Sequence, residues 1–129
     1  MTEALKELVN RWLQKAANDL RSADRLINSD PPLTDTACFH CQQSIEKDLK
    51  AYLAYNEEDI QRTHNIVFLL SKCAAFDPVF GDVDPGDIDR YAVEVRYAEF
   101  EEMPSLEDTQ ALYGLAEKVK ALVKDRIIF

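Results

Sequence analysis

Residues 38–53 read CFHCQQSIEKDLKAYL. Apolar residues recur here at the spacing of a helix that buries one face; they are Cys38, Cys41, Ile45, Leu49, Tyr52 and Leu53. A second face is formed by His40, Gln43, Ser44 and Lys47, because positions three, four and seven apart stack together on a helix. The stretch therefore predicts a helix that meets its own bundle on one side and a ligand or a dimer mate on the other.

Helical periodicity also marks the beginning of the chain. Residues 3–28 carry an apolar stripe made of Leu5, Leu8, Val9, Trp12, Ala16, Leu20, Ala23 and Ile27. Pro31 and Pro32 end this helix, because proline lacks a backbone donor and biases the residue before it away from helix. Thr34 or Asp35 is then the expected N-cap of the second helix.

The middle of the chain predicts a short helix and a further long one. Thr63 is the expected cap of a short helix over residues 64–75. Residues 76–86 contain two prolines and two glycines and predict the longest irregular connection. Asp84, followed by a proline, predicts the start of a helix over residues 85–97.

A capping signal precedes the last helix. Ser105 with Asp108 three residues later resembles a capping box. The helix is expected to bury Ala111, Leu112, Leu115, Val119, Leu122 and Val123. Since no segment has a strand pattern and 129 residues suit one core, we expect a single all-α domain over residues 1–129. Its predicted architecture is an antiparallel up-and-down bundle of four long helices plus one short helix.

The composition narrows the function classes. Aspartate and glutamate number 24 against 15 lysines and arginines, giving a net charge of −9. Such a surface repels phosphate backbones and anionic membranes, so broad nucleic-acid binding and membrane binding are not expected. No stretch approaches the roughly 18 consecutive apolar residues of a membrane span. Three cysteines without a secretory h-region favour a reduced, cytoplasmic protein.

The cysteines and the acidic run do not predict a metal centre. Cys38 and Cys41 fall on the apolar face, and only the distant Cys73 remains as another thiol, so core thiols are the better interpretation than a zinc site. Glu99, Glu101 and Glu102 lack the matched carboxylates and histidines of a di-metal bundle, and a solvated acidic turn is expected. We predict neither a metal nor a cofactor.

Four groups of short motifs follow one another along the chain. They are, in order, Trp12, Ala16, Asp19-Leu20 and Ala23; Phe39-His40-Cys41-Gln42-Gln43, Glu46-Lys47 and Leu49-Lys50-Ala51; Thr63-His64 and Leu69-Leu70; and Tyr91, Arg96 and Tyr97. The second of these groups is the most specific. In this order the motifs resemble those of the HEPN family. The resemblance implies a helical up-and-down bundle that usually pairs as a homodimer. It also implies a toxin–antitoxin setting, since such members are often encoded beside a small nucleotidyltransferase.

The family's ribonuclease signature is missing from the chain. Ribonuclease members carry an arginine, four to six arbitrary residues and then a histidine. The three arginine positions before His64 hold Glu57, Glu58 and Asp59, and those before His40 hold Leu33, Thr34 and Asp35; the histidine positions after Arg96 hold Glu101, Glu102 and Met103. Carboxylates repel a phosphate group. The sequence therefore argues against RNA cleavage by the family route, and no catalytic residue is predicted.

The candidate ligand-binding residues are His40, Gln43, Lys47, His64, Arg96 and Tyr97. The first three would line a polar pocket for a nucleotide or phosphate, while Arg96 and Tyr97 would bind phosphate and stack a base. A structural interpretation stays open for each. The helix face would then be a solvated or dimer-facing polar network, His64 a capping or packing residue, and Arg96 the ion-pair partner of Glu99 or Asp19.

Three function classes follow. The first is a noncatalytic HEPN-like module that binds a partner protein, with a minimal nucleotidyltransferase as the expected partner and a nucleotide as the expected ligand. The alternative is an RNA-cleaving toxin with a rearranged site, in which His40 or His64 is the base and Arg96 the phosphate clamp. The third is a purely structural dimer that stabilises another chain.

Overall fold

Five helical elements form the part of the chain that the computed structural model describes, residues 1–60, 62–86 and 103–129. They are α1 (Glu3–Ile27), α2 (Thr34–Tyr55), α3 (Ile66–Ala74), the 3-10 helix η1 (Pro78–Asp82) and α4 (Leu106–Arg126). Within these ranges there is no strand, and the all-α prediction is confirmed. The helix predicted over residues 85–97 lies almost wholly outside the described residues.

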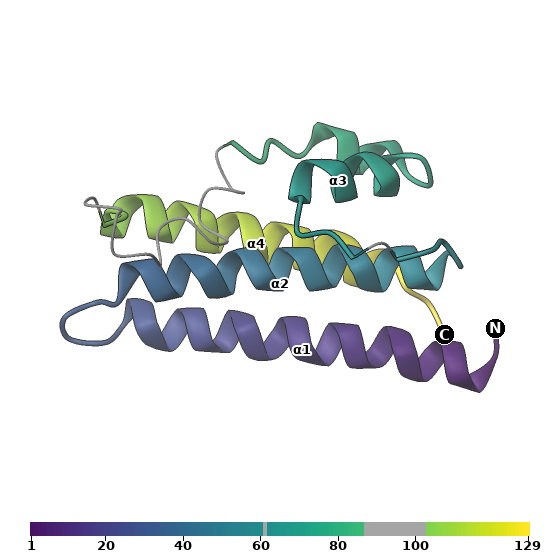
Figure 1. Cartoon of the computed structure of the whole chain (residues 1–129), viewed down its shortest axis with the longest axis horizontal. Coiled ribbons are helices and arrows are strands. Elements are labelled where there is room, and N and C mark those ends of the chain that lie inside the picture. The colour runs from purple at the N-terminus through teal and green to yellow at the C-terminus, as the bar shows by residue number, and fades with distance from the viewer. Residues whose placement is uncertain (61, 87–102) are drawn as a thin grey trace.

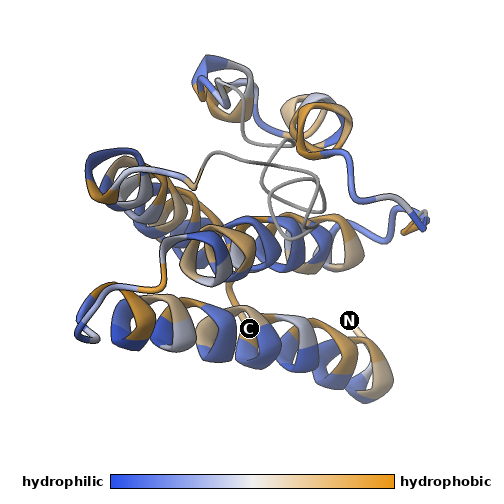
Figure 2. Cartoon of the chain, turned by 60° about the vertical axis from the view of Figure 1, so that its left-hand side comes forward, coloured by the Kyte–Doolittle hydropathy of each residue, from blue (hydrophilic) through white to orange (hydrophobic). Residues whose placement is uncertain are grey.

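The long helix α2 is the centre of the bundle. It packs against α1, α3 and α4, and Figure 1 places α1 and α3 on opposite sides of it. The direction of α1 is opposite to that of both α2 and α4. Figure 2 shows hydrophilic and hydrophobic strips alternating around each helix, as expected when only one side faces the core.

Small residues let α1 and α2 approach closely. Ser44 of α2, which we expected on the polar second face of that helix, is fully buried instead, and its hydroxyl donates a hydrogen bond of 2.9 Å to the backbone carbonyl of Ala16 on α1. Ala37 and Ala51, seven positions to either side of Ser44, are also fully buried.

All eight residues of the apolar stripe predicted for α1 are at least partly buried, which confirms that pattern.

Two predicted helix starts were wrong. The N-cap of α2 is Leu33, which makes no side-chain cap bond; the Asp35 carboxylate instead accepts from the backbone amide of Thr36 at 2.8 Å. The cap of α3 is Asn65, whose side chain accepts from the Phe68 amide at 2.9 Å. Consequently α3 begins at Ile66 and not at residue 64. Asparagine is at least as good an N-cap as threonine, so the helix begins after Asn65, which lies closer to the apolar residues of α3.

The last helix begins as predicted. The hydroxyl of Ser105 accepts from the backbone amide of Asp108 at 3.0 Å, which confirms the cap. Ala111, which we expected in the core, is exposed. Thr109 is fully buried in its place. Its hydroxyl donates to the Ser105 carbonyl at 2.7 Å and accepts from the Cys38 thiol at 3.4 Å, so that its polar atom is satisfied within the core.

The predicted irregular connection holds a structured segment. Helix η1 begins after Asp77, and its Phe80 is fully buried with its ring 4.8 Å from that of Tyr52. Arg126 at the end of α4 donates to the Asp77 carboxylate at 2.6 Å. The apolar residues of this segment are interrupted by prolines and glycines and give no sustained helical period, which is why the sequence pattern missed this part of the core.

The cysteine prediction is confirmed. Cys38, Cys41 and Cys73 are free and fully buried. Burial raises the pKa of Cys41 and that of Cys73 to about 12, so both are neutral thiols near pH 7. Among the described residues, no group of three or more histidine, cysteine or acidic side chains is placed to hold a metal ion. None of the helices in these residues is long and apolar enough to cross a membrane.

Candidate functional site

The polar face of α2 consists of His40, Gln43, Glu46, Lys47 and Lys50. These positions are three or four residues apart and therefore lie along one side of the helix. Two of the five are almost fully buried, Glu46 at 3% and Lys50 at 6% exposure. Charged residues are rarely buried to that degree unless they are paired. The face is therefore organised by internal contacts.

The first cluster joins α2 to α1 through Asp19. One carboxylate oxygen of Asp19 lies 2.8 Å from Nδ1 of His40, and the other accepts from the Lys47 ammonium at 2.5 Å. The Asp19 side chain is only 12% exposed, and those of His40 and Lys47 are 27% and 23% exposed. The structure thus brings together two of the predicted ligand-binding residues, and it gives both a partner within the chain.

The second cluster joins α2 to the segment that leads into α3. One oxygen of Glu46 lies 2.9 Å from Nδ1 of His64, and the other accepts from the Lys50 ammonium at 3.0 Å. Lys50 also lies over the ring of Trp12 on α1, 5.5 Å from its centroid. The ion pair between Glu46 and Lys50 is buried, but the His64 side chain is 72% exposed. A histidine is therefore fixed through Nδ1 while most of its ring faces solvent.

Gln43 belongs to the second cluster. Its amide donates to the side-chain oxygen of Gln42 at 2.9 Å, and Gln42 donates in turn to the backbone carbonyl of His64 at 3.3 Å. Gln42 is fully buried, so this chain of amides ties the loop to the helix. The residues predicted to line one pocket are thus divided between two clusters. His40 and Lys47 contact Asp19, whereas Gln43 is linked to the backbone of His64 through Gln42.

Two candidates cannot be placed beside these clusters. Arg96 and Tyr97 lie outside the described residues, as does Glu99, the expected local partner of Arg96. Asp19, the other expected partner of Arg96, has each of its carboxylate oxygens in contact with His40 or Lys47.

The acidic positions before His64 leave this part of the chain with a carboxylate-rich surface. Among them, Glu58 pairs with Lys72 of α3 at 3.3 Å.

Sequence reasoning missed the two carboxylates that organise the face. Asp19 and Glu46 both stood within the motifs that we compared with the HEPN family, yet neither was assigned a contact with a histidine. Glu46 and Lys50 are four residues apart, which is a helical ion-pair spacing that the sequence does display. The Asp19 contacts span more than 20 residues of sequence and carry no such local signal.

The fold and this site define a small helical bundle whose central helix carries two carboxylate–histidine–lysine clusters. The sequence matches the HEPN domain family over residues 9–126, and the chain belongs to that family. Among solved structures it is similar to ST0689, an archaeal HEPN homologue, at 26% sequence identity and a TM-score of 0.65. That alignment covers 93% of this chain and 98% of the archaeal one. No curated protein matches the sequence.

Proposed function

We propose that this chain is a noncatalytic HEPN module that binds a partner protein and a nucleotide in a toxin–antitoxin-type system. The partner is of the minimal nucleotidyltransferase class, which the family resemblance implies, and the module acts as a homodimer. The observation that carries the proposal is the pairing of each histidine with a buried carboxylate that also holds a lysine.

This pairing favours binding over phosphodiester cleavage. Cleavage by the family route requires a guanidinium and an imidazole that both reach one phosphate. Here each histidine shares its carboxylate with a lysine, and that carboxylate, Asp19 or Glu46, already compensates the charge of the lysine. A compensated cation attracts a phosphate less, and the carboxylates beside it repel one. The same networks make the face rigid, which suits a preorganised binding surface.

The nucleotide is proposed to lie on the polar face of α2. His64 contributes the most accessible polar side chain there, and Gln43 and Lys47 lie along the same face at part-buried positions. Arg96 and Tyr97 complete the proposed ligand set, as a phosphate contact and a stacking ring. A nucleotide held in this way would contact the edges of both clusters without displacing their internal hydrogen bonds.

The test is co-purification from the native host combined with an RNA assay. We expect tagged protein to retain a nucleotidyltransferase-class partner and to leave total RNA intact. His64→Ala is expected to weaken nucleotide binding by about tenfold, which corresponds to one lost hydrogen bond of about 1.4 kcal/mol. Ser71→Ala, an exposed change on α3, serves as the control. Cleavage of RNA that disappears in His40→Ala, His64→Ala or Arg96→Ala would overturn the noncatalytic assignment.

A second candidate function, RNA cleavage through a rearranged site, is favoured by one observation. Glu46 fixes Nδ1 of His64 while the ring stays 72% exposed. A buried carboxylate that orients an accessible imidazole is also the arrangement of a general base. If this function holds, RNA is cleaved and the activity falls in both His64→Ala and Glu46→Gln but persists in His40→Ala. Absence of cleavage by the unaltered protein and its partner complex would exclude it.

A further inference from the structure

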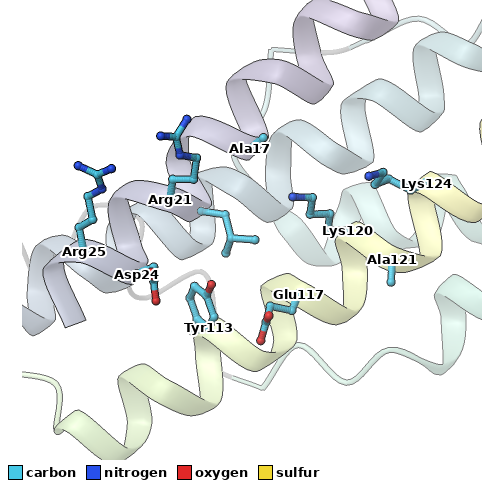
Figure 3. A pocket seen from close by; sticks show the side chains of 10 residues that line it. Ala17, Arg21, Asp24, Arg25, Tyr113, Glu117, Lys120, Ala121 and Lys124 are labelled. Atoms are coloured by element: carbon cyan, nitrogen blue, oxygen red, sulfur yellow. The ribbon is translucent and has the colours of Figure 1, made fainter. Parts of the chain in front are cut away.

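A groove of about 500 Å³ runs between α1 and α4, away from the polar face of α2. Four cations line it, Arg21 and Arg25 from α1 and Lys120 and Lys124 from α4. Figure 3 shows the two pairs on facing helices, with Lys120 extending from α4 toward α1. Asp19 and Arg21 are two positions apart on α1, so the groove and the Asp19 cluster occupy different faces of that helix.

The groove concentrates positive charge on an acidic protein. Its four cations outnumber its two carboxylates, Asp24 and Glu117, whereas the chain as a whole carries −9. Among the described residues, none of the four cations has an acidic side chain within ion-pair distance, in contrast to Lys47, Lys50, Lys72 and Arg126. Asp24 is itself engaged, since its carboxylate accepts from the Asn28 amide at 3.1 Å. Within the described part of the chain, the four cations therefore keep charge that an external anion can neutralise.

A buried carboxylate of α2, Asp48, lies near the two lysines of the groove but is not among the residues that line it. Asp48 of α2 is 2% exposed, and within the described part of the chain its Oδ2 has no hydrogen-bond partner. Burial raises the pKa of Asp48 to about 7, and the charges of Lys120 and Lys124 oppose that rise, which places both lysines near it. Because Asp48 is largely protonated below pH 7, it compensates these lysines only in part.

We infer that the groove is a binding site for a compact oligophosphate, a chain of two or three linked phosphate groups. Arg21 and Arg25 are one helical turn apart, as are Lys120 and Lys124, so the Cβ atoms of the two cationic residues on each wall lie about 5–6 Å apart. The volume falls in the range of small-ligand sites. A long polyanion such as RNA would also have to approach the acidic remainder of the surface, which disfavours it.

Isothermal titration with inorganic tripolyphosphate at fixed low ionic strength tests the inference. The double variant Arg21→Gln/Lys120→Gln is expected to bind at least tenfold more weakly than the unaltered protein, because two charge-assisted contacts are lost. The matched control is Arg11→Gln/Lys118→Gln, which removes the same charge from exposed positions of the same two helices outside the groove. The control is expected to change the affinity less than about twofold.

A variant that is expected to bind more tightly keeps the test valid even if the Arg21→Gln/Lys120→Gln variant fails to fold. Glu117→Gln removes one of the two groove carboxylates and is expected to tighten tripolyphosphate binding about threefold, since one repulsive charge is lost. Tripolyphosphate, ATP and adenosine, titrated in parallel, identify the source of the phosphates. Equal affinity for the first two indicates a free oligophosphate. Tighter ATP binding that is lost in Tyr113→Leu indicates a nucleotide whose base contacts that ring.

The inference is separable from the proposed function. It is overturned if the unaltered protein does not bind tripolyphosphate, or if the groove variant and its control weaken binding equally. Binding that is lost in Lys47→Gln and His64→Gln but kept in the groove variant would place the phosphate site on the polar face of α2 and would also overturn it. Loss in the groove variant alone supports the groove and leaves partner binding to be judged by co-purification.

Discussion

The two carboxylate–histidine–lysine clusters are built from the same three residue types but expose them differently. In the Asp19 cluster all three side chains are partly covered, and the carboxylate links two helices. In the Glu46 cluster the ion pair lies within one helix and is buried, while His64 comes from a loop and is largely exposed. The same chemistry thus cross-links the bundle in one place and presents an oriented imidazole in the other.

This difference follows from where each histidine stands in the chain. His40 lies in the interior of α2, so packing against α1 fixes its depth. His64 precedes the Asn65 cap, where the backbone is not constrained by helical hydrogen bonds on both sides. The Asp19 cluster is therefore expected to contribute mainly to stability, and the Glu46 cluster to combine stability with contact to a ligand.

The largest effect is expected from breaking the buried ion pair. Glu46→Ala leaves the Lys50 ammonium, 6% exposed, without its carboxylate, and we expect a loss of about 3–5 kcal/mol in the free energy of unfolding. Urea denaturation followed by Trp12 fluorescence measures it. The double variant Glu46→Leu/Lys50→Met should recover most of the loss, because no unpaired charge remains buried. A loss below about 1 kcal/mol in Glu46→Ala would contradict the buried-pair interpretation.

Asp48 contrasts with Glu46, because it is a buried carboxylate of α2 that has no hydrogen-bonded lysine within the described residues. Its pKa is raised from 3.8 to about 7 by burial, so the folded state favours the neutral acid. The contribution of Asp48 to the free energy of unfolding should therefore be largest below about pH 4 and fall as the pH rises to about 7.

Asp48→Asn is expected to abolish this pH dependence. At about pH 8 the variant should be more stable than the unaltered protein by up to about 4 kcal/mol, with little difference near pH 4. Urea denaturation across this pH range measures the effect, and the exposed Asp125→Asn on α4 is the control. If the dependence persists unchanged in Asp48→Asn, another group is responsible for it.

The smallest effects should separate the two histidines. His40→Ala removes a part-buried contact to Asp19 and is expected to cost about 1 kcal/mol of folding free energy. His64→Ala changes a side chain that is 72% exposed and should stay within about 0.5 kcal/mol. Thermal unfolding of both variants in the same buffer gives the difference. A larger loss for His64→Ala would reverse the roles assigned to the two clusters.

Local pattern was sufficient for some elements and insufficient for others. The bounds of α1 and the Ser105 cap were predicted because apolar spacing and a capping side chain are both local properties. The burial of Phe80 and the contacts of Asp19 were not, because each depends on a segment distant in sequence. The α1–α4 groove was missed for the same reason, since its two walls are separated by most of the chain.

By itself the sequence determined the all-helical class, the apolar face of α2, the core position of the thiols and the missing arginine–histidine spacing, because helical periodicity and residue spacing are written along the chain. Only the tertiary structure decided which carboxylate holds which histidine, and that four cations from two distant helices line one groove. The physical reason is that hydrogen bonds and ion pairs act over a few ångströms in space, and folding alone brings such distant residues within that range.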